Sequence, residues 1–210
     1  MLDDPFHVNS LVERLSRALD PVDGRPGEPL RGDGDLNGAP SPTGRALRPA
    51  AVLAPLVMRK TGLSVVFTRR ADHLSAHAGQ ISFPGGRLNV GENPVDAALR
   101  ESEEEIGLLR SQVRLIGQFD PYETVTGFQI TPFVGLVDPA AGFRADPGEV
   151  AEIFETPFDF LMNPANHVLE ERMFAGQLRR YYAMPHEGRY IWGATAGLLK
   201  ALADRFNASR

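Results

Sequence analysis

Residues 85–108 read GGRLNVGENPVDAALRESEEEIGL, a double glycine followed by a polar loop and a segment of helical periodicity. Asn93 can cap a helix, Pro94 suits the first helical turn, and Gly107 suits the residue after the last turn. We therefore expect a helix over residues 94–106, joined to the double glycine by a short loop. Arg100 and Glu92 are expected to form an ion pair that holds this loop against the helix.

The expected helix separates an apolar face from an acidic flank. Its buried stripe consists of Val95, Ala98, Leu99, Ser102 and Ile106, which fall within about 100° of one another on a helical wheel.

Glu101, Glu104 and Glu105 lie on the flank, and carboxylates at spacings of three and four residues repel one another. Most glutamate runs are simply solvated, but this one follows a glycine pair whose bare backbone can approach a ligand. A hard divalent cation, Mg²⁺ or Mn²⁺, would offset the repulsion because such ions bind oxygen ligands.

The fixed positions of residues 86–108 resemble the signature of the Nudix hydrolases. The matching residues are Gly86, Glu92, Arg100, Glu101, Glu104, Glu105, Gly107 and Leu108. Ser102 departs from the signature, which usually has an aliphatic residue there.

The resemblance implies an α+β Nudix fold, a mixed β-sheet sandwiched between helices (α/β/α), and hydrolysis of a nucleoside diphosphate linked to another moiety. It also implies that Glu101, Glu104 and Glu105 bind the metal, with the backbone carbonyl near Gly86 as a further ligand. Arg100 would orient Glu101.

The preceding residues, 68–86, read TRRADHLSAHAGQISFPGG and resemble the additional signature of the coenzyme A pyrophosphatase branch. Ser75 departs from it, because the branch usually has an arginine there. The resemblance continues through residues 125–132, 149–154 and 192–196. It implies cleavage of coenzyme A or its acyl derivatives into 4′-phosphopantetheine, or its acyl form, and adenosine 3′,5′-bisphosphate. Residues expected to contact the substrate are Arg70, His77, Gly85 and Gly86.

Three residues are candidates for the general base: Glu101, Glu149 and Glu152. Glu149 follows the turn-like residues 146–148 and is favoured, whereas Glu152 would lie one turn further if a helix began there. Arg59, Lys60 and Arg69 are additional candidates for phosphate contacts, since guanidinium groups donate paired hydrogen bonds to phosphate. His77 is expected mainly to brace the loop that ends at Gly86.

Composition narrows the possible functions. The chain of 210 residues has no Cys, which excludes a disulfide framework, a thiolate zinc site and a cysteine nucleophile. Its 22 Lys and Arg against 27 Asp and Glu argue against a nucleic-acid backbone as partner. We expect a small-molecule nucleotide substrate, no membrane partner, and a cytoplasmic location because the N-terminus lacks the pattern of a signal peptide. A homodimer is plausible.

The expected organisation has three parts: an amphipathic N-terminal helix within residues 1–19, a Gly- and Pro-rich linker at 20–49, and the hydrolase domain at 50–210. Ser10 and Glu13 are spaced as a capping box for the first helix. The remaining expected elements are a hairpin of strands 51–58 and 63–68, strands 113–119 and 130–137, and a helix over 192–206.

Two alternatives remain. The first is a Nudix pyrophosphatase for ADP-ribose, NADH or nucleoside triphosphates. The second is a Nudix module that binds nucleotides without hydrolysing them, and the complete set of signature carboxylates speaks against it.

Overall fold

The computed structural model describes residues 5–22, 31–38, 46–174 and 176–209. Its helices are α1 (Pro5–Ala18), α2 (Pro94–Ile106), α3 (Phe158–Met162) and α4 (Ala194–Ala208), with short 3₁₀ turns at Arg110–Gln112 and Pro164–Asn166. The strands are β1 (Arg31–Gly32), β2 (Arg48–Arg59), β3 (Gly62–Arg70), β4 (Ile81–Ser82), β5 (Gly85–Arg87), β6 (Val113–Gln118), β7 (Tyr122–Glu123), β8 (Phe128–Val137), β9 (Val150–Pro157), β10 (Val168–Phe174), β11 (Gln177–His186) and β12 (Arg189–Trp192).

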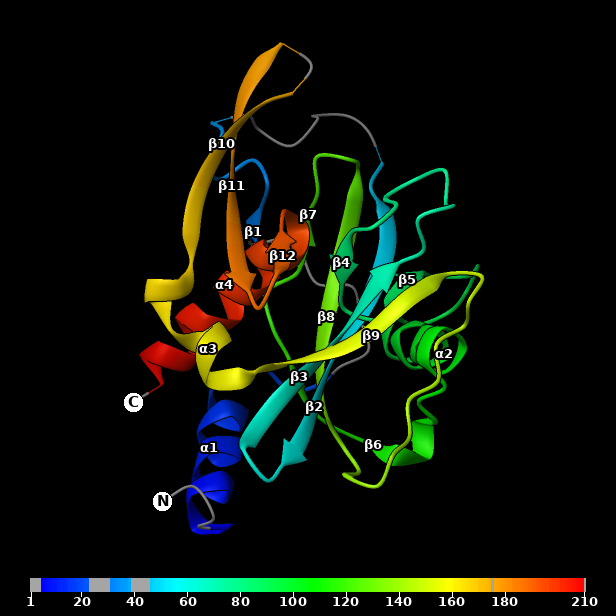
Figure 1. Cartoon of the computed structure of the whole chain (residues 1–210), viewed down its shortest axis with the longest axis vertical. Helices are drawn as coiled ribbons and strands as arrows, with labels where there is room; N and C mark the ends of the chain where they lie inside the picture. The colour runs from blue at the N-terminus through cyan, green and yellow to red at the C-terminus, as the bar shows by residue number, and fades with distance from the viewer. Residues whose placement is uncertain (1–4, 23–30, 39–45, 175, 210) are drawn as a thin grey trace.

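The main sheet is mixed and lies between two helical layers, as Figure 1 shows. Its central strand β2 runs parallel to β8 and antiparallel to β3 and β5. Side chains alternate along β2: Leu53 and Val57 pack into the cluster beneath α2, whereas Ala54 and Leu56 pack into the cluster shared with α1, α3 and α4. The predicted α/β/α arrangement is therefore confirmed.

Most predicted elements are present with shifted ends. The helix over 94–106 matches the prediction at both ends, and the expected hairpin corresponds to the longer strands β2 and β3. The C-terminal helix begins at Ala194 because residues 189–192 form β12. The capping box at Ser10 and Glu13 was wrong, since α1 begins at Pro5 and places Ser10 inside the helix.

Part of the expected linker packs on the domain. β1 pairs in parallel with β7, and the following Asp33 accepts hydrogen bonds from the Tyr122 hydroxyl, at 2.8 Å, and from the backbone N–H of Val125, at 2.7 Å. Residues 23–30 and 39–45 of the expected linker lie outside the described residues. β2 starts at Arg48, so its first two residues precede the expected domain boundary.

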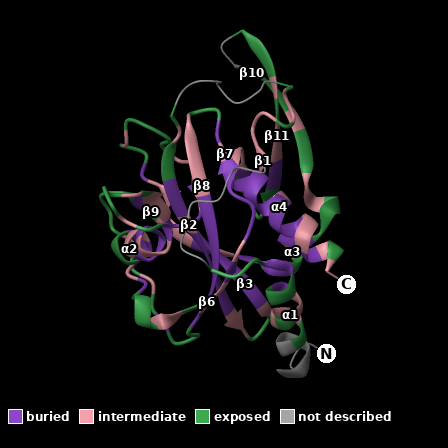
Figure 2. Cartoon of the chain, turned by 180° about the vertical axis from the view of Figure 1, so that it is seen from behind, coloured by how far each residue is buried: buried purple, intermediate pink, exposed green. Residues whose placement is uncertain are grey.

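A second sheet of strands β10, β11 and β12 was not predicted. Its outer part projects from the molecule and is largely exposed, while α4 and the strands β2 and β3 of the main sheet are mostly buried (Figure 2). Met173 and Leu178 face each other across this hairpin and are more than half exposed. Among the described residues, no helix is long and apolar enough to cross a membrane.

Candidate active site

Helix α2 is closed at both ends by the residues that the sequence indicated. The Asn93 side chain accepts a hydrogen bond from the N–H of Asp96 at 2.9 Å, which satisfies one otherwise free donor of the first turn. Gly107 adopts a left-handed conformation with φ of 67°, and its N–H bonds to the Glu103 carbonyl. The two caps fix where the acidic residues of α2 lie along the helix.

The buried face of α2 differs from the expected stripe at four positions. Pro94, Ala97 and Glu105 are buried, whereas Val95 is only partly buried. Glu105 therefore does not lie on an exposed flank. Ser102, the departure from the signature, is fully buried, and its hydroxyl donates to the Ala98 carbonyl at 2.7 Å. The serine is thus satisfied within the helix.

The double glycine lies directly against the acidic face of α2. A Cβ atom at Gly86 would collide with the Glu101 carboxylate, and one at Gly85 would collide with the backbone of β2. The Gly85 N–H donates to Glu105 Oε2 at 3.2 Å. Gly86 therefore allows β5 to approach the Glu101 carboxylate, and Gly85 allows it to approach β2.

Arg100 joins the loop to three carboxylates. Its Nε and Nη2 donate to the two oxygens of Glu92 at 2.8 and 3.0 Å, so the expected ion pair is present. Its Nη1 donates to Glu101 Oε1 at 2.8 Å and to Glu104 Oε2 at 2.9 Å. Nη2 also bonds to the Arg87 carbonyl at 3.1 Å. A single guanidinium therefore orients Glu101 and holds the glycine loop in place.

Burial makes negative charge costly at this site. Desolvation raises the pKa of Glu105 to about 8, against the opposing hydrogen bond from Gly85, and the nearby charge of Glu101 raises it further. The pKa of Glu101 is also raised, chiefly by burial, although Arg100 opposes this. Two partly desolvated carboxylates side by side favour a cation, which would stabilise both in their charged forms.

The donor set fits a divalent cation of the Mg²⁺ or Mn²⁺ type, because Glu101, Glu104 and Glu105 offer carboxylate oxygens and Gly86 a backbone carbonyl beside them. Within the described residues, no three acidic or histidine side chains already converge on one point. Glu104 instead points to Arg100 as an exposed (i, i+4) pair, a contact worth only about 0.3–0.5 kcal/mol. Its side chain can turn to a metal at little cost.

Arg70 and Glu149 lie next to this cluster. Arg70 Nη1 is 3.9 Å from Glu105 Oε1 and 3.9 Å from Glu149 Oε2. The strands β3 and β9 pair at this end, and the N–H of Ala71 bonds to the Glu149 carbonyl at 2.8 Å. A cation and a half-exposed carboxylate thus stand at the rim of the acidic site.

Glu152 lies elsewhere because residues 150–157 form a strand and not the helix considered above. Its carboxylate accepts from Arg189 at 2.5 Å and lies 3.7 Å from Arg69. Arg59 pairs with Glu155, and it is eight residues along β2 from Ala51, the partner of Gly86, or roughly 26 Å at about 3.3 Å per residue. The structure does not bring these residues to the acidic site.

His77 braces its loop in the expected manner. Its Nδ1 lies 2.8 Å from Gln80 Oε1, and its backbone has a positive φ of 59°, which is uncommon for a residue with a side chain. The N–H of Gly79 and the carbonyl of Gln80 bond to the backbone of Arg70. The loop is therefore tied to the strand that carries Arg70.

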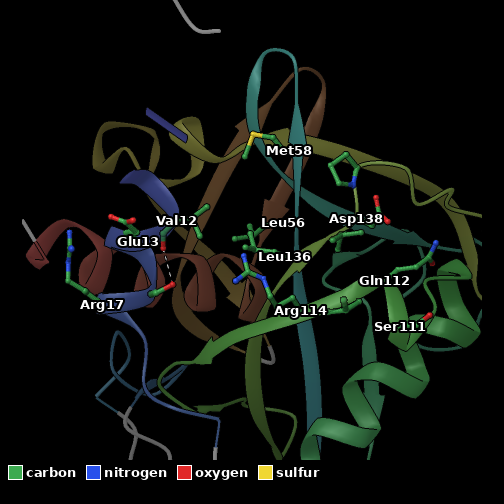
Figure 3. A pocket seen from close by; sticks show the side chains of 14 residues that line it. Val12, Glu13, Arg17, Leu56, Met58, Ser111, Gln112, Arg114, Leu136 and Asp138 are labelled. Carbon is green, nitrogen blue, oxygen red and sulfur yellow. Dashed lines mark hydrogen bonds between the residues drawn. The ribbon is translucent and has the colours of Figure 1, made fainter. Parts of the chain in front are cut away.

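A groove of about 910 Å³ lies between α1 and the strands β2, β6 and β8 (Figure 3). Val12 and Arg17 of α1 line it together with Leu56, Met58, Arg114 and Leu136. None of the acidic-site residues lines this groove.

Two arginines that gather around Phe128 were not predicted from the sequence. Arg48 and Arg87 both approach the ring of Phe128, with guanidinium carbons 3.9 and 5.1 Å from its centroid. The position of Arg87 directly after Gly86 was the available signal. Arg48 reaches the Phe128 ring because β2 pairs with β8, and the local sequence does not encode this pairing.

Fold and site together define an α/β/α protein in which a capped acidic helix packs against a double-glycine strand. The family model of the NUDIX domain matches residues 47–175, and the chain therefore belongs to the Nudix family. It is 38% identical over 159 residues to the uncharacterized Nudix hydrolase NudL of Yersinia enterocolitica, covering 75% of this chain and 81% of the relative. It is also 38% identical over 157 residues to NudL of Escherichia coli K12, covering 74% and 81%.

Among solved structures, the MutT protein of Methanosarcina mazei superposes with a TM-score of 0.47 at 17% identity, covering 79% of this chain and 95% of that one. The family match and the two relatives support a Nudix hydrolase, which acts on pyrophosphate bonds of nucleotide-like substrates.

Proposed function

We propose that this Nudix hydrolase cleaves the diphosphate bridge of coenzyme A or its acyl derivatives, releasing 4′-phosphopantetheine or its acyl form and adenosine 3′,5′-bisphosphate. The observation that carries the proposal is the segment TRRADHLSAHAGQISFPGG at 68–86, which resembles the coenzyme A pyrophosphatase signature. Its arginine, Arg70, stands 3.9 Å from both Glu105 and Glu149, where it can bind a diphosphate oxygen.

In this proposal, Glu101, Glu104, Glu105 and the Gly86 carbonyl hold Mg²⁺ or Mn²⁺. When bound, the cation neutralises the diphosphate and lowers the pKa of a coordinated water. Arg100 keeps Glu101 in place through its bond at 2.8 Å and keeps the loop in place through Glu92. The missing side chain at Gly86 lets β5 lie directly against the Glu101 carboxylate.

Glu149 is the general base that the geometry favours. Its side chain is about half exposed and contacts Arg70, and its charge acts on both Glu101 and Glu105. A carboxylate in this position can accept the proton of an attacking water while Arg70 holds the phosphate. Glu152 lacks this access because Arg189 and Arg69 bind its carboxylate.

Ser75 favours a second candidate. With serine in place of the arginine usual in the branch, one phosphate contact is missing, so ADP-ribose, NADH or a nucleoside triphosphate is the alternative substrate. A non-catalytic nucleotide-binding module is less consistent with a site that retains all three glutamates of α2.

A substrate panel tests the proposal. Initial rates are measured with coenzyme A, dephospho-coenzyme A, ADP-ribose and NADH, each with Mg²⁺, with Mn²⁺ and with chelator. The highest kcat/KM is expected for coenzyme A or an acyl derivative, and only with metal. A higher kcat/KM for ADP-ribose or NADH would retain Nudix chemistry and overturn the assignment of substrate.

A further inference from the structure

Strand β10 has one free edge. It lies at the outside of the three-stranded sheet and pairs with β11 on its other side only. The hairpin of β10 and β11 projects from the molecule (Figure 1), and no other strand of the described part of the chain pairs with the outer edge. An uncovered strand edge is a template for pairing with a further strand, and β10 contains neither Pro nor Lys, which commonly block such edges.

The backbone groups that face this edge follow from the contacts of Arg180. Its N–H donates to Asn37 Oδ1 at 2.8 Å and its carbonyl accepts from Asn37 Nδ2 at 3.1 Å, so both groups point away from β10. Arg180 lies opposite Glu171, and hydrogen-bonded and non-hydrogen-bonded pairs alternate along an antiparallel ladder. The N–H and carbonyl of Glu171 therefore point to the free edge, and those of Leu169 and Met173, two residues away on either side, do the same.

Exposed apolar side chains gather on this small sheet. Leu169 and Met173 lie on one face of β10 and are 51% and 62% exposed, and Leu178 lies opposite Met173 with 54% exposed. Of the nine large apolar side chains that are exposed in the described residues, five belong to this sheet: Val168, Leu169, Met173, Leu178 and Tyr190. Such a concentration on one projecting element indicates an interaction surface.

The opposite face of the hairpin carries two arginines without a counter-charge. Arg172 and Arg179 lie directly opposite each other, and neither forms an ion pair within the described ranges. The Nε of Arg179 is buried without a hydrogen-bond partner among the same residues. Like charges directly opposite each other destabilise a sheet. A carboxylate that approached Arg172 from the free edge would offset this repulsion.

We propose that β10 pairs antiparallel with β10 of a second copy of this chain, around a two-fold axis at Glu171. In this register Glu170 of each copy lies opposite Arg172 of the other, and Leu169 lies opposite Met173. The pairs at the axis and at Leu169 and Met173 are formed by the residues whose backbone groups face the edge, so they can exchange hydrogen bonds. The contact is self-complementary and closes as a symmetric dimer.

The charges of β10 select this register. An axis at Glu170 or at Arg172 would bring two like charges together and would leave no opposite charges paired across the edge. At the chosen axis the two Glu171 side chains meet, but each already pairs with Arg180 of its own copy at 2.7 Å. The shared edge is short, so we expect a weak dimer with a dissociation constant in the micromolar range.

A proline variant tests the strand pairing. Sedimentation velocity at roughly 1–300 μM, the range in which weak complexes dissociate, is measured for the wild type, Glu171→Pro and Glu171→Ala. Glu171→Pro removes an N–H that points outward, so the hairpin itself loses no backbone bond. Its dissociation constant should rise about tenfold or more because two symmetric hydrogen bonds are lost. Glu171→Ala removes the same side chain, keeps the N–H, and should still dimerise.

A charge reversal tests the pairing of Glu170 with Arg172. Arg172→Glu places two carboxylates opposite each other at both ends of the contact and should weaken the dimer about tenfold or more. Arg114→Glu is the matched control, because Arg114 is also an exposed arginine on a strand, β6, outside the contact. It should dimerise like the wild type. Circular dichroism verifies the folding of each variant.

An introduced thiol tests the register, since the chain has no Cys of its own. With Glu171→Cys the two thiols face each other across the axis, where Cα atoms of a hydrogen-bonded pair are about 5.5 Å apart. With Leu169→Cys the two positions are four residues apart along the strands, or roughly 13 Å. A short thiol-specific crosslinker should therefore join Glu171→Cys in preference to Leu169→Cys.

The outcomes separate the dimer from its register. A wild type that stays monomeric throughout the concentration range, or a dimer that neither Glu171→Pro nor Arg172→Glu weakens, overturns the proposal. Preferential crosslinking of Leu169→Cys overturns the register. These measurements do not involve hydrolysis, so they do not depend on the proposed function.

Discussion

At the scale of single residues, the geometry of the site depends most strongly on the absence of a side chain at Gly86. Gly86→Ala places a Cβ against the Glu101 carboxylate, which must move away from the loop. Displacing a reacting group by about 1 Å can cost roughly 100-fold in rate, and we expect a loss of that order in kcat. The control is Gly142→Ala, where an added Cβ meets no atom within 4 Å. Equal activity of both variants would contradict this account.

The two candidate bases differ in their surroundings and therefore in the expected effect of substitution. Glu149→Gln should lower kcat by about 100-fold or more, the usual contribution of a general base, with little change in KM. Glu152→Gln removes the contacts to Arg189 and Arg69 and should cost no more than about 1 kcal/mol of stability. Steady-state kinetics and urea unfolding of both variants distinguish them. A larger loss of kcat in Glu152→Gln would reverse the assignment.

The burial of Glu105 shows what residue patterns could not predict. Helical spacing placed Glu101, Glu104 and Glu105 on one flank, but the rotation of α2 against the sheet decides which of them is covered. The Gly85 N–H satisfies the Glu105 carboxylate in its buried position. Gly85 belongs to β5, whereas Glu105 belongs to α2. The burial of the Glu105 carboxylate can therefore be explained only from the tertiary structure.

At the scale of elements, the N-cap of α2 is a local device with a measurable contribution. Asn93→Ala removes the acceptor of the Asp96 N–H and should cost about 1 kcal/mol. For a chain of 150–250 residues, that corresponds to a fall in Tm of about 2–4 °C. Asn93→Ser keeps a capping oxygen and should restore most of the loss. Unchanged thermal unfolding of Asn93→Ala would show that the cap does not stabilise the fold.

Local signals also explain which elements could be predicted. Asn93, Pro94 and Gly107 mark the ends of α2 by their own conformational preferences, so the helix matched the prediction residue for residue. The sheet formed by β10–β12 had no such signal, because charged runs at 170–172 and 179–180 interrupt the alternation expected of a half-buried strand. β1 depends on Tyr122 and Val125, about 90 positions away in the chain.

At the scale of the whole molecule, His167 makes stability depend on pH. Burial lowers its pKa below the ordinary value of 6.5. Its Nε2–H donates to the Leu161 carbonyl at 2.7 Å, while Nδ1 is buried without a partner among the described residues. The unfolded chain therefore binds a proton more readily than the folded chain as pH falls below 6.5.

The free energy of unfolding should accordingly decrease from pH 7 to pH 5, by at most about 1.4 kcal/mol per pH unit for this residue. His167→Gln retains a donor for Leu161 and cannot be protonated, so this part of the pH dependence should disappear. Urea unfolding of both proteins at pH 5, 6 and 7 measures the difference. The same pH dependence in the variant would assign it to other groups.

The most direct test of the central claim is mass-spectrometric analysis of the products that the wild type and Glu105→Gln form from coenzyme A with Mg²⁺, with circular dichroism to verify folding. The wild type is expected to form 4′-phosphopantetheine and adenosine 3′,5′-bisphosphate, with neither product after chelation and almost none from the folded variant. Wild-type-like product formation by Glu105→Gln, or intact coenzyme A after incubation with the wild type and metal, would contradict the proposed function.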